Sequence, residues 1–536
     1  MVTKPKGRTV YRPKTRSGCI TCRYALISAI PNKERADHVR ERHVKCDEKK
    51  PHCNRCKSIG KACGGYDTIR LAQATTTANG ELTLAWVRPS ESPPDICSRE
   101  REAFQYFQLE SLQFLPGHVQ SPLWSHHVLQ LSRSEPAVWH AAIALASIEH
   151  ESRVHAVRSR CFALEQYSKA MKALRCSMVK CTKTSPVTAL IVCLLFIAFE
   201  FQQGREDQAS KHLSGGLQIV RDQLEGKHDR QTDGITTELI EAFERLDIQE
   251  SLYASSRVTL HRGLALKFAA SSPPISKISS YLEARRTLIP CIAAMRELWY
   301  HVEIHMLSPN GLTTEALQRF RALQSEQLRA LASWEERMPY AFSQLIDERE
   351  RQAARVLQMH HLAYEVMLAT CLADGREVAF DEHIADFEHL VQLVTTFNDA
   401  AASAHEHGEQ LSVNSFLDMG IIPPLYYAAI RCREPATRHA LLDLLSICKH
   451  REGAWDGPFT ARMARSIIAI EEEGLILEEA SDVPEARRLH NAFFSVNSCG
   501  QCIVACRRRC FEEDGRWIEY NVEVDADNPS RISNSS

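Results

Sequence analysis

Six cysteines near the N-terminus are the residues most able to do chemistry in this chain. They are Cys19, Cys22, Cys46, Cys53, Cys56 and Cys63. Thiolates are good zinc ligands, and a CxxC pair lets two of them reach one metal from a single turn. One tetrahedral zinc would leave two thiolates over, and two separate zincs would need more than six. Six thiolates can give each of two Zn2+ ions per chain four ligands only if two sulfurs bridge both metals. The six cysteines therefore predict a binuclear cluster.

The text around these cysteines, CITCR followed by RHVKCDEKKPHCNRCKSIGKAC, resembles the fungal Zn2Cys6 DNA-binding domain. The usual spacing of that domain is C-x2-C-x6-C-x6-C-x2-C-x6-C, and only the second interval differs here. The resemblance implies that Cys19 and Cys53 bridge, that Cys22 and Cys46 complete one zinc site, and that Cys56 and Cys63 complete the other. A structural zinc ribbon built on two CxxC pairs is the alternative, but that pattern does not use six cysteines.

Charge is distributed unevenly and supports a polyanionic partner for this segment. Residues 1–63 contain 17 Lys and Arg against 5 Asp and Glu, a net charge of +12, whereas the whole chain has −2. A basic head on an acidic body indicates binding to a polyanion such as double-stranded DNA.

The resemblance also implies which residues meet the DNA. In the family a short helix after the second cysteine enters the major groove. Arg42 and His43 match the base-reading pair, and Arg23 and Lys45 would hold phosphates. Guanine N7 and O6 suit such donors, so the resemblance implies a CGG-type half-site.

An insertion of 17 residues, 24–40, interrupts this segment between Cys22 and Cys46. Its removal restores the family spacing to the residue, which suggests that it is translated intron. The alternative is a genuine loop insertion, because loop-closure cost grows slowly with length. The position inside the recognition helix favours the intron hypothesis. If the insertion is real protein, zinc binding and DNA reading are both in doubt.

The remaining chain divides by composition. Residues 1–66 form the zinc module, 67–97 a linker rich in Thr, Gly, Ser and Pro, 98–520 a large all-α domain, and 521–536 a fraying tail. Phrases such as EAFQYFQLESLQFLPG and CREPATRHALLDLLSICKHREGAWDG resemble the second type of fungal-specific regulatory domain. The predicted fold class is therefore a small Zn2Cys6 module plus a large all-α helical domain.

Three local features of the large domain can be tested against a structure. Ser185-Pro186 predicts a helix start and Gly204 its end, with the apolar run 187–199 as a central buried helix. Cys499, Cys502, Cys506 and Cys510 are spaced to lie on one face of a helix. We expect them to be packed core rather than a metal or redox site. The arginines 507–509 would then stabilise that helix's C-terminus.

Several function classes are disfavoured. The sequence contains no GxSxG, HExxH or P-loop motif, so no catalytic residues are predicted, and the histidine pairs 126–127 and 360–361 are expected at the surface or in a satisfied core. The longest apolar run has 13 residues, too short to span a membrane.

The sequence predicts a nuclear transcription regulator acting with RNA polymerase II, with coregulators and a homodimer as further partners. The alternative is a helical interaction or ligand-sensing protein whose interrupted zinc module does not bind DNA.

Overall fold

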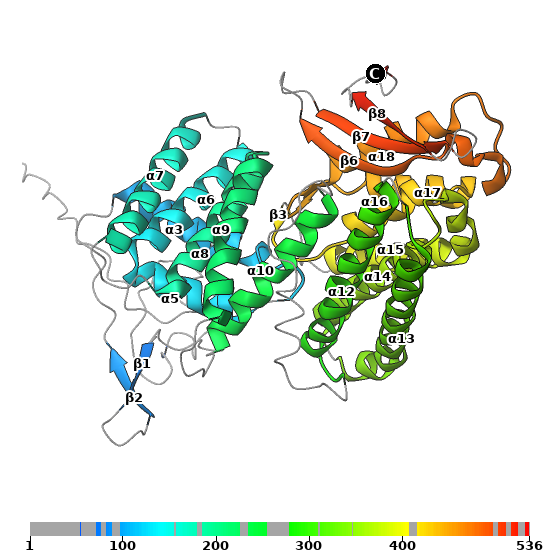
Figure 1. Cartoon of the computed structure of the whole chain (residues 1–536). Coiled ribbons are helices and arrows are strands. Elements are labelled where there is room, and N and C mark those ends of the chain that lie inside the picture. Colours follow the sequence, from blue (N-terminus) through cyan, green and yellow to red (C-terminus); the bar gives the residue numbers. More distant parts are fainter. Residues whose placement is uncertain are drawn as a thin grey trace, which may run out of the picture. The chain divides into compact units, whose positions relative to one another are not determined.

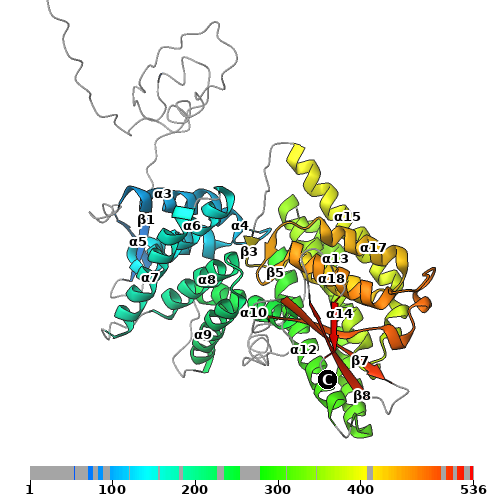
Figure 2. The same ribbon diagram turned by 90° about the horizontal axis from the view of Figure 1, so that it is seen from above.

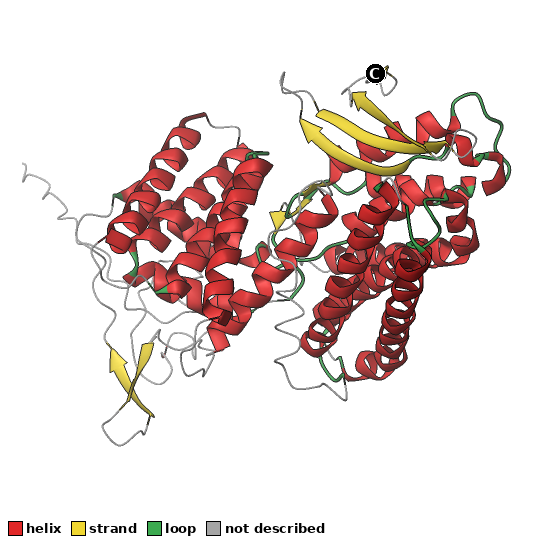
Figure 3. Ribbon diagram, viewed as in Figure 1, coloured by secondary structure: helices red, strands yellow, loops and turns green. Residues whose placement is uncertain are grey.

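The computed structural model describes fifteen parts of the chain. They are Asn54 and residues 71–76, 82–87, 97–119, 121–154, 157–179, 185–225, 234–253, 278–308, 311–345, 347–406, 415–496, 502–510, 516–523 and 531–534. The chain separates into two compact units, Met1–Ile96 and Cys97–Ser536. Helices make up most of the described chain, which confirms a large helical region (Figure 3). None of the described helices is both long enough and apolar enough to cross a membrane.

A β-hairpin lies within the segment that composition predicts as a linker. Strands β1 (Leu71–Thr76) and β2 (Leu82–Val87) pair antiparallel, with Leu71 opposite Val87. The residues between them include Asn79-Gly80, a pair typical of hairpin turns. The composition of this segment predicts a linker, but the Asn79-Gly80 pair within it is a sequence signal for a hairpin.

The larger unit begins with a group of helices that includes the apolar helix α8. They are α3 (Ser98–Tyr106), η1 (Phe107–Ser111), α4 (Leu112–Phe114), η2 (Leu123–His127), α5 (Val128–Ser134), α6 (Pro136–Val154), α7 (Val157–Val179), α8 (Pro186–Gln202), α9 (Glu206–Glu225) and α10 (Gly234–Tyr253). Helix α8 lies among α6, α7, α9 and α10 and contacts all four (Figure 1). Most of its residues are buried. The predicted central buried helix is confirmed.

Both predicted ends of α8 are confirmed as well. Ser185 is the N-cap residue and Pro186 occupies the first helical position, where the missing N–H costs no hydrogen bond. At the other end Gly204 has φ +64, the left-handed conformation that glycine adopts without strain. The Gly204 and Arg205 amides donate to the carbonyls of Phe201 and Glu200, which satisfies the last turn as a Schellman motif.

Adjacent glycines in α9 give a matched pair for testing this packing. A Cβ added at Gly216 would lie 2.1 Å from the Phe243 ring, whereas one at Gly215 would meet nothing within 4 Å. Phe243 is fully buried, so it cannot move aside cheaply. We expect Gly216→Ala to destabilise the protein by about 1–3 kcal/mol through overpacking. Gly215→Ala should stabilise it by about 0.5–1 kcal/mol.

Urea unfolding followed by tryptophan fluorescence measures both changes. Equal midpoints for the two variants would show that α9 and α10 do not pack as closely as the structure has them.

Three long helices form a second core. They are α12 (Tyr281–Leu307), α13 (Thr314–Gln344) and α14 (Glu348–Thr370), which pack side by side (Figure 2). Each begins at a side chain that accepts a backbone amide: Ser280 from Glu283, Thr313 from Ala316, and Asp347 from Arg349. These caps satisfy orphan N–H groups, so the helix starts are encoded locally.

The next elements complete the helical body. They are η3 (Glu377–His383), α15 (Ile384–Glu406), α16 (Ile422–Arg431), α17 (Pro435–Ser446), α18 (Gly457–Glu472), η4 (Ala480–Asp482) and η5 (Glu485–Arg487). Short strands β3 (Ser415–Phe416), β4 (Arg451–Glu452) and β5 (Trp455–Asp456) form a small sheet in the order β3-β4-β5.

The C-terminal cysteines and arginines lie in a sheet, not in a helix, and that part of the sequence interpretation is wrong. The strands are β6 (His490–Val496), β7 (Cys502–Cys510), β8 (Arg516–Glu523) and β9 (Arg531–Asn534), antiparallel in that order. Cys506 is buried, as the core interpretation expects, whereas Cys499 lies outside the described residues. Arginines 507–509 are part of β7 and end no helix.

Two further differences follow from this sheet. The large helical region also carries a sheet, since β6, β7 and the start of β8 lie in the range predicted to be helical. Within the predicted tail, 521–536, strand β9 pairs with β8.

A buried ion cluster joins the two cores. Leu417 packs in the first core and Met419 in the second, with Asp418 between them. The Asp418 carboxylate lies 2.9 Å from Nε of Arg245 on α10 and 3.3 Å from Nη1 of Arg285 on α12. One aspartate therefore holds helices from both cores.

Candidate functional site

All residues predicted to bind zinc or DNA lie outside the described part of the chain. They are Cys19, Cys22, Cys46, Cys53, Cys56, Cys63, Arg23, Arg42, His43 and Lys45. The predicted insertion, 24–40, lies outside it as well. The donor set itself fits zinc, because six thiolates are soft ligands of the kind this metal takes. The individual ligands and DNA contacts stay predictions.

Buried charges dominate the chemistry of the helical unit. The carboxylate of Glu377, at the start of η3, accepts from Nη1 of Arg431 at 2.6 Å and Nη1 of Arg433 at 3.1 Å. Nδ1 of His490, on β6, lies 2.8 Å from its other oxygen. Glu377 is only 2% exposed, so its charge is compensated by these partners rather than by water.

A second buried carboxylate shares one of these arginines. Glu471, near the end of α18, is fully buried and accepts from Nη2 of Arg433 at 2.8 Å and from Arg438 of α17. It also accepts the backbone amide of Leu489 at 2.6 Å. The two glutamates thus fix η3, α16, α17, α18 and β6 to one another.

The arginine partners lower the pKa of both buried glutamates, Glu377 and Glu471. Burial alone would raise the pKa of Glu377, but the positive charges of Arg431 and Arg433 and the bond from His490 outweigh it and hold that pKa well below its usual range. Burial likewise opposes ionisation of Glu471, and Arg433 and Arg438 lower its pKa more strongly. Both groups are therefore ionised in the folded protein.

A third buried carboxylate, Glu452, holds the start of α16. It accepts the amides of Ile421 and Ile422, each at 2.9 Å, which are orphan donors at a helix N-terminus. Nε2 of His450 lies 2.7 Å away. A Cβ at Gly420 would lie 2.0 Å from this carboxyl group, so only glycine fits there.

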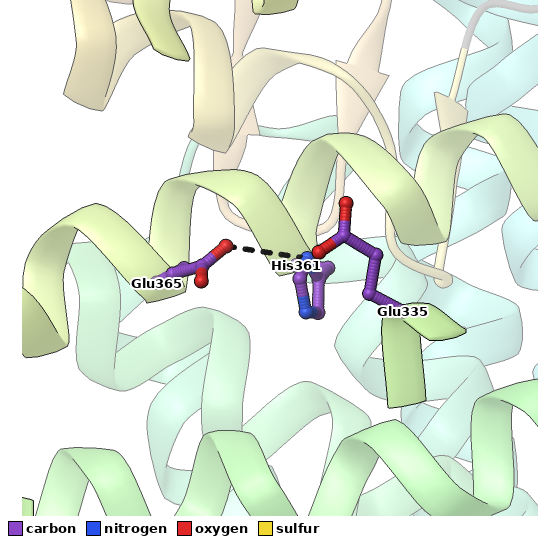
Figure 4. Close-up of side chains that lie close together, drawn as sticks. All are labelled: Glu335, His361 and Glu365. Carbon is purple, nitrogen blue, oxygen red and sulfur yellow. Dashed lines mark ion pairs between the residues drawn. The ribbon is translucent and has the colours of Figure 1, made fainter. Parts of the chain in front are cut away.

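Among the described residues, one group of side chains converges in the manner of metal ligands. Glu335 on α13 and His361 and Glu365 on α14 place their ligand atoms within 4.8 Å of one another (Figure 4). Nε2 of His361 donates to the Leu331 carbonyl at 3.0 Å, and the Trp334 ring stacks on the imidazole at 5.0 Å. These two contacts account for the burial of His361, and no metal is assigned to the group.

The histidine pairs occupy the positions that the sequence predicts. His360 is buried, and its Nε2 donates to the Gly420 carbonyl at 2.8 Å, whereas His126 is exposed. His126 is therefore a surface residue, and His360 is a core residue whose ring nitrogen is hydrogen-bonded.

Comparison with known proteins assigns the larger unit to a family. A model of the fungal specific transcription factor domain matches residues 103–462, more than half of the chain. This chain belongs to that family. The family's members regulate transcription and are not enzymes, in agreement with the sequence interpretation.

The second family model concerns the cysteine segment. The fungal Zn(2)-Cys(6) binuclear cluster domain, which binds two zinc ions and DNA, matches residues 37–73. That match contains Cys46, Cys53, Cys56 and Cys63 together with Arg42, His43 and Lys45. Cys19, Cys22 and Arg23 precede it, on the far side of the insertion.

Curated relatives are regulators of the same kind. The aspercryptin biosynthesis cluster-specific transcription regulator atnN of Emericella nidulans is 20% identical, with 88% of this chain and 90% of the relative covered. Transcription regulator lscL of Purpureocillium lilacinum is 27% identical over 34% of this chain and 48% of its own length. The Zn(2)-C6 fungal-type transcription factor afumD of Aspergillus fumigatus is 28% identical over 41% and 55%. No solved structure matches this chain.

The buried carboxylates are the residues that sequence reasoning missed in this transcription factor domain. One local signal was available, because CREP places Arg433 and Glu434 just before a proline at a helix start. Glu434 accepts the amides of Ala436 and Thr437, and Pro435 begins α17. The cap could be read from the sequence, but the partners of Arg433 could not.

Proposed function

We propose that this protein is a nuclear, sequence-specific regulator of RNA polymerase II transcription that binds CGG-type DNA through a zinc binuclear cluster. The observation that carries the proposal is the set of six cysteines with five intervals, four of them at the family spacing. The net charge of +12 over residues 1–63 supports a DNA partner.

Each predicted zinc-binding or DNA-binding residue has a role in this proposal. Cys19 and Cys53 bridge two Zn2+ ions, and the other four cysteines complete the two tetrahedra. Arg42 and His43 donate to guanine in the major groove, which gives sequence preference. Arg23 and Lys45 bind phosphates, which positions the module without reading sequence.

A second candidate function is favoured by one observation. The binuclear cluster match begins at residue 37 and leaves the first CxxC pair outside it. If the insertion is present in the working protein, the chain is a helical interaction or ligand-sensing protein whose zinc module does not bind DNA. Sequencing of cDNA decides which form exists. Coregulators and a homodimer are proposed partners under either function.

DNA binding by protein lacking residues 24–40 tests the main proposal. We expect binding to CGG-containing duplex that weakens steeply with salt, because each neutralised phosphate releases counterions. Arg42→Ala should lower the preference for CGG over random DNA by about 1–3 kcal/mol. Lys45→Ala should weaken binding to all sequences alike and reduce the salt slope by about 1.

Fluorescence anisotropy on specific and random duplexes measures both effects. An equal loss on the two duplexes for both variants would contradict the division between base-reading and phosphate-binding residues.

A further inference from the structure

A cavity of about 110 Å³ lies in the helical unit, between α12, α14 and α16. Six aromatic residues contribute to its lining: Trp299, Tyr364, Phe380, Tyr426, Tyr427 and Trp455. An apolar cavity of about 150 Å³ in another protein takes one benzene molecule, so this volume suits a ligand about one ring in size. The aromatic lining favours a flat ligand that packs against rings.

The charged residues that line the cavity already have partners in the protein. Nη1 of Arg431 lies 2.6 Å from the carboxylate of Glu377. Burial raises the pKa of Asp247 to about 6, and the positive charge of Arg296 opposes that rise, so Arg296 already acts on this carboxyl group. Arg376 also has an interaction partner. A charged ligand would lose its water without meeting a free opposite charge, so the cavity favours an uncharged ligand.

Two tyrosine hydroxyls at this cavity lack partners. Tyr364 is 2% exposed and Tyr426 is 6% exposed, and within the described chain neither hydroxyl has a hydrogen-bond partner. Their rings are held in place, Tyr364 against His360 at 5.9 Å and Tyr426 against Trp455 at 5.5 Å. Buried polar groups are nearly always paired, so two unpaired hydroxyls at one cavity indicate an occupant that forms hydrogen bonds.

We propose that this cavity binds a small uncharged phenol. The ligand ring packs among the aromatic side chains, and its hydroxyl accepts a hydrogen bond from one of the two tyrosines and donates one to the other, since a hydroxyl is both donor and acceptor. Tyr364 belongs to the second hydrophobic core and Tyr426 to the first, so the occupant links the two cores. The proposal goes beyond the proposed function, because this site needs neither zinc nor DNA.

Titration of the full-length protein with phenol at neutral pH, where phenol is uncharged, tests the proposal. Calorimetry should show saturable binding to one site, and the melting temperature should rise with the phenol concentration. Benzoate, an aromatic ring with a negative charge, should bind at least about tenfold more weakly, because no positive charge is free to receive it. Absence of saturable binding at millimolar phenol, or equal affinity for benzoate, would overturn the proposal.

Removal of the unpaired hydroxyls tests their role. Tyr364→Phe and Tyr426→Phe keep the rings, and each should lower the affinity for phenol about fivefold, as expected for one lost hydrogen bond. Toluene has the size of phenol but no hydroxyl, so its affinity should stay the same or rise in both variants. Tyr340→Phe, on an exposed tyrosine of α13, is the matched control and should change neither affinity. Equal losses for phenol and toluene in the cavity variants, or no loss for either, would contradict the assigned hydrogen bonds.

Filling the cavity tests its location. Ala363 of α14 lines the cavity and is buried, so Ala363→Leu should occupy part of the space. Affinity for phenol and for toluene should fall at least about tenfold, and the unliganded protein should melt at the same or a higher temperature, as cavity-filling substitutions commonly do. Ala330→Leu, on an exposed alanine of α13, is the control and should leave both affinities unchanged.

Two results from Ala363→Leu would count against the site. Unchanged affinity for phenol would place the probe elsewhere in the protein. A lower melting temperature without phenol would show that the space beside Ala363 is already filled.

Discussion

Replacing Cys53 with alanine in protein that lacks residues 24–40 is expected to unfold the zinc module and abolish specific DNA binding. In the proposed cluster Cys53 bridges both metals, so its loss leaves neither tetrahedron complete. Structural zinc supplies the folding energy of small metal modules, about 10–16 kcal/mol in zinc-finger peptides. Metal analysis should give two zincs per chain before the substitution and fewer than one after it.

Cys97→Ala is the matched control, because Cys97 is an exposed free cysteine outside the motif. It should retain two zincs per chain. A single zinc in the shortened protein, or two zincs after Cys53→Ala, would contradict the binuclear assignment.

The same measurements on protein with the insertion test the intron hypothesis. A chain that keeps residues 24–40 should bind less zinc and show no preference for CGG, because the insertion falls inside the predicted recognition helix. Full zinc content and CGG preference in that form would favour an evolved insertion. Transcripts that mostly retain the codons of residues 24–40 would also favour an evolved insertion.

Features encoded over a few residues could be predicted from the sequence. Ser185-Pro186 and Gly204 bound α8 because a cap, a fixed φ and a positive φ are each properties of a single residue. The intervening apolar run had to be buried on all sides, and α8 is. The zinc cluster is likewise predicted from a local feature, the spacing of the cysteines.

The C-terminal sheet shows where periodicity fails. Cysteines at 499, 502, 506 and 510 fit a helical stripe, but positions 502, 506 and 510 also fit one face of a strand. What decides between them is pairing, since Cys506 lies opposite both Ala492 and Tyr520. Short segments with mixed composition do not specify that partner by themselves.

The buried charges could not be predicted for a related reason. A charged residue in a helix is usually exposed, so Glu471 and Arg438 look like a solvated face. Their burial depends on partners 33 residues apart along the chain, in α18 and α17. Only the tertiary fold brings them together.

Glu471→Gln is expected to destabilise the helical unit by about 3–5 kcal/mol, because it removes the buried carboxylate that Arg433 and Arg438 share. Among the described residues, Arg433 then keeps only Glu377 as a charged partner, and Arg438 keeps only Glu472. Both arginines are almost fully buried, so water cannot replace the lost carboxylate. Glu473→Gln, at an exposed position just after α18, is the control and should stay within about 0.5 kcal/mol of the original protein. Urea unfolding at neutral pH measures both.

The pH dependence of the same unfolding gives an independent check on the direction of the pKa shifts. Glu377 and Glu471 have folded pKa values below the usual one, so the unfolded chain binds more protons as the pH falls. Their stabilisation is fully present above the unfolded pKa of about 4.3 and is lost as the pH drops below it. Glu471→Gln removes one of these groups, so its stability should fall less steeply between neutral and acid pH. An identical slope in the two proteins would mean that Glu471 is not held ionised by Arg433 and Arg438.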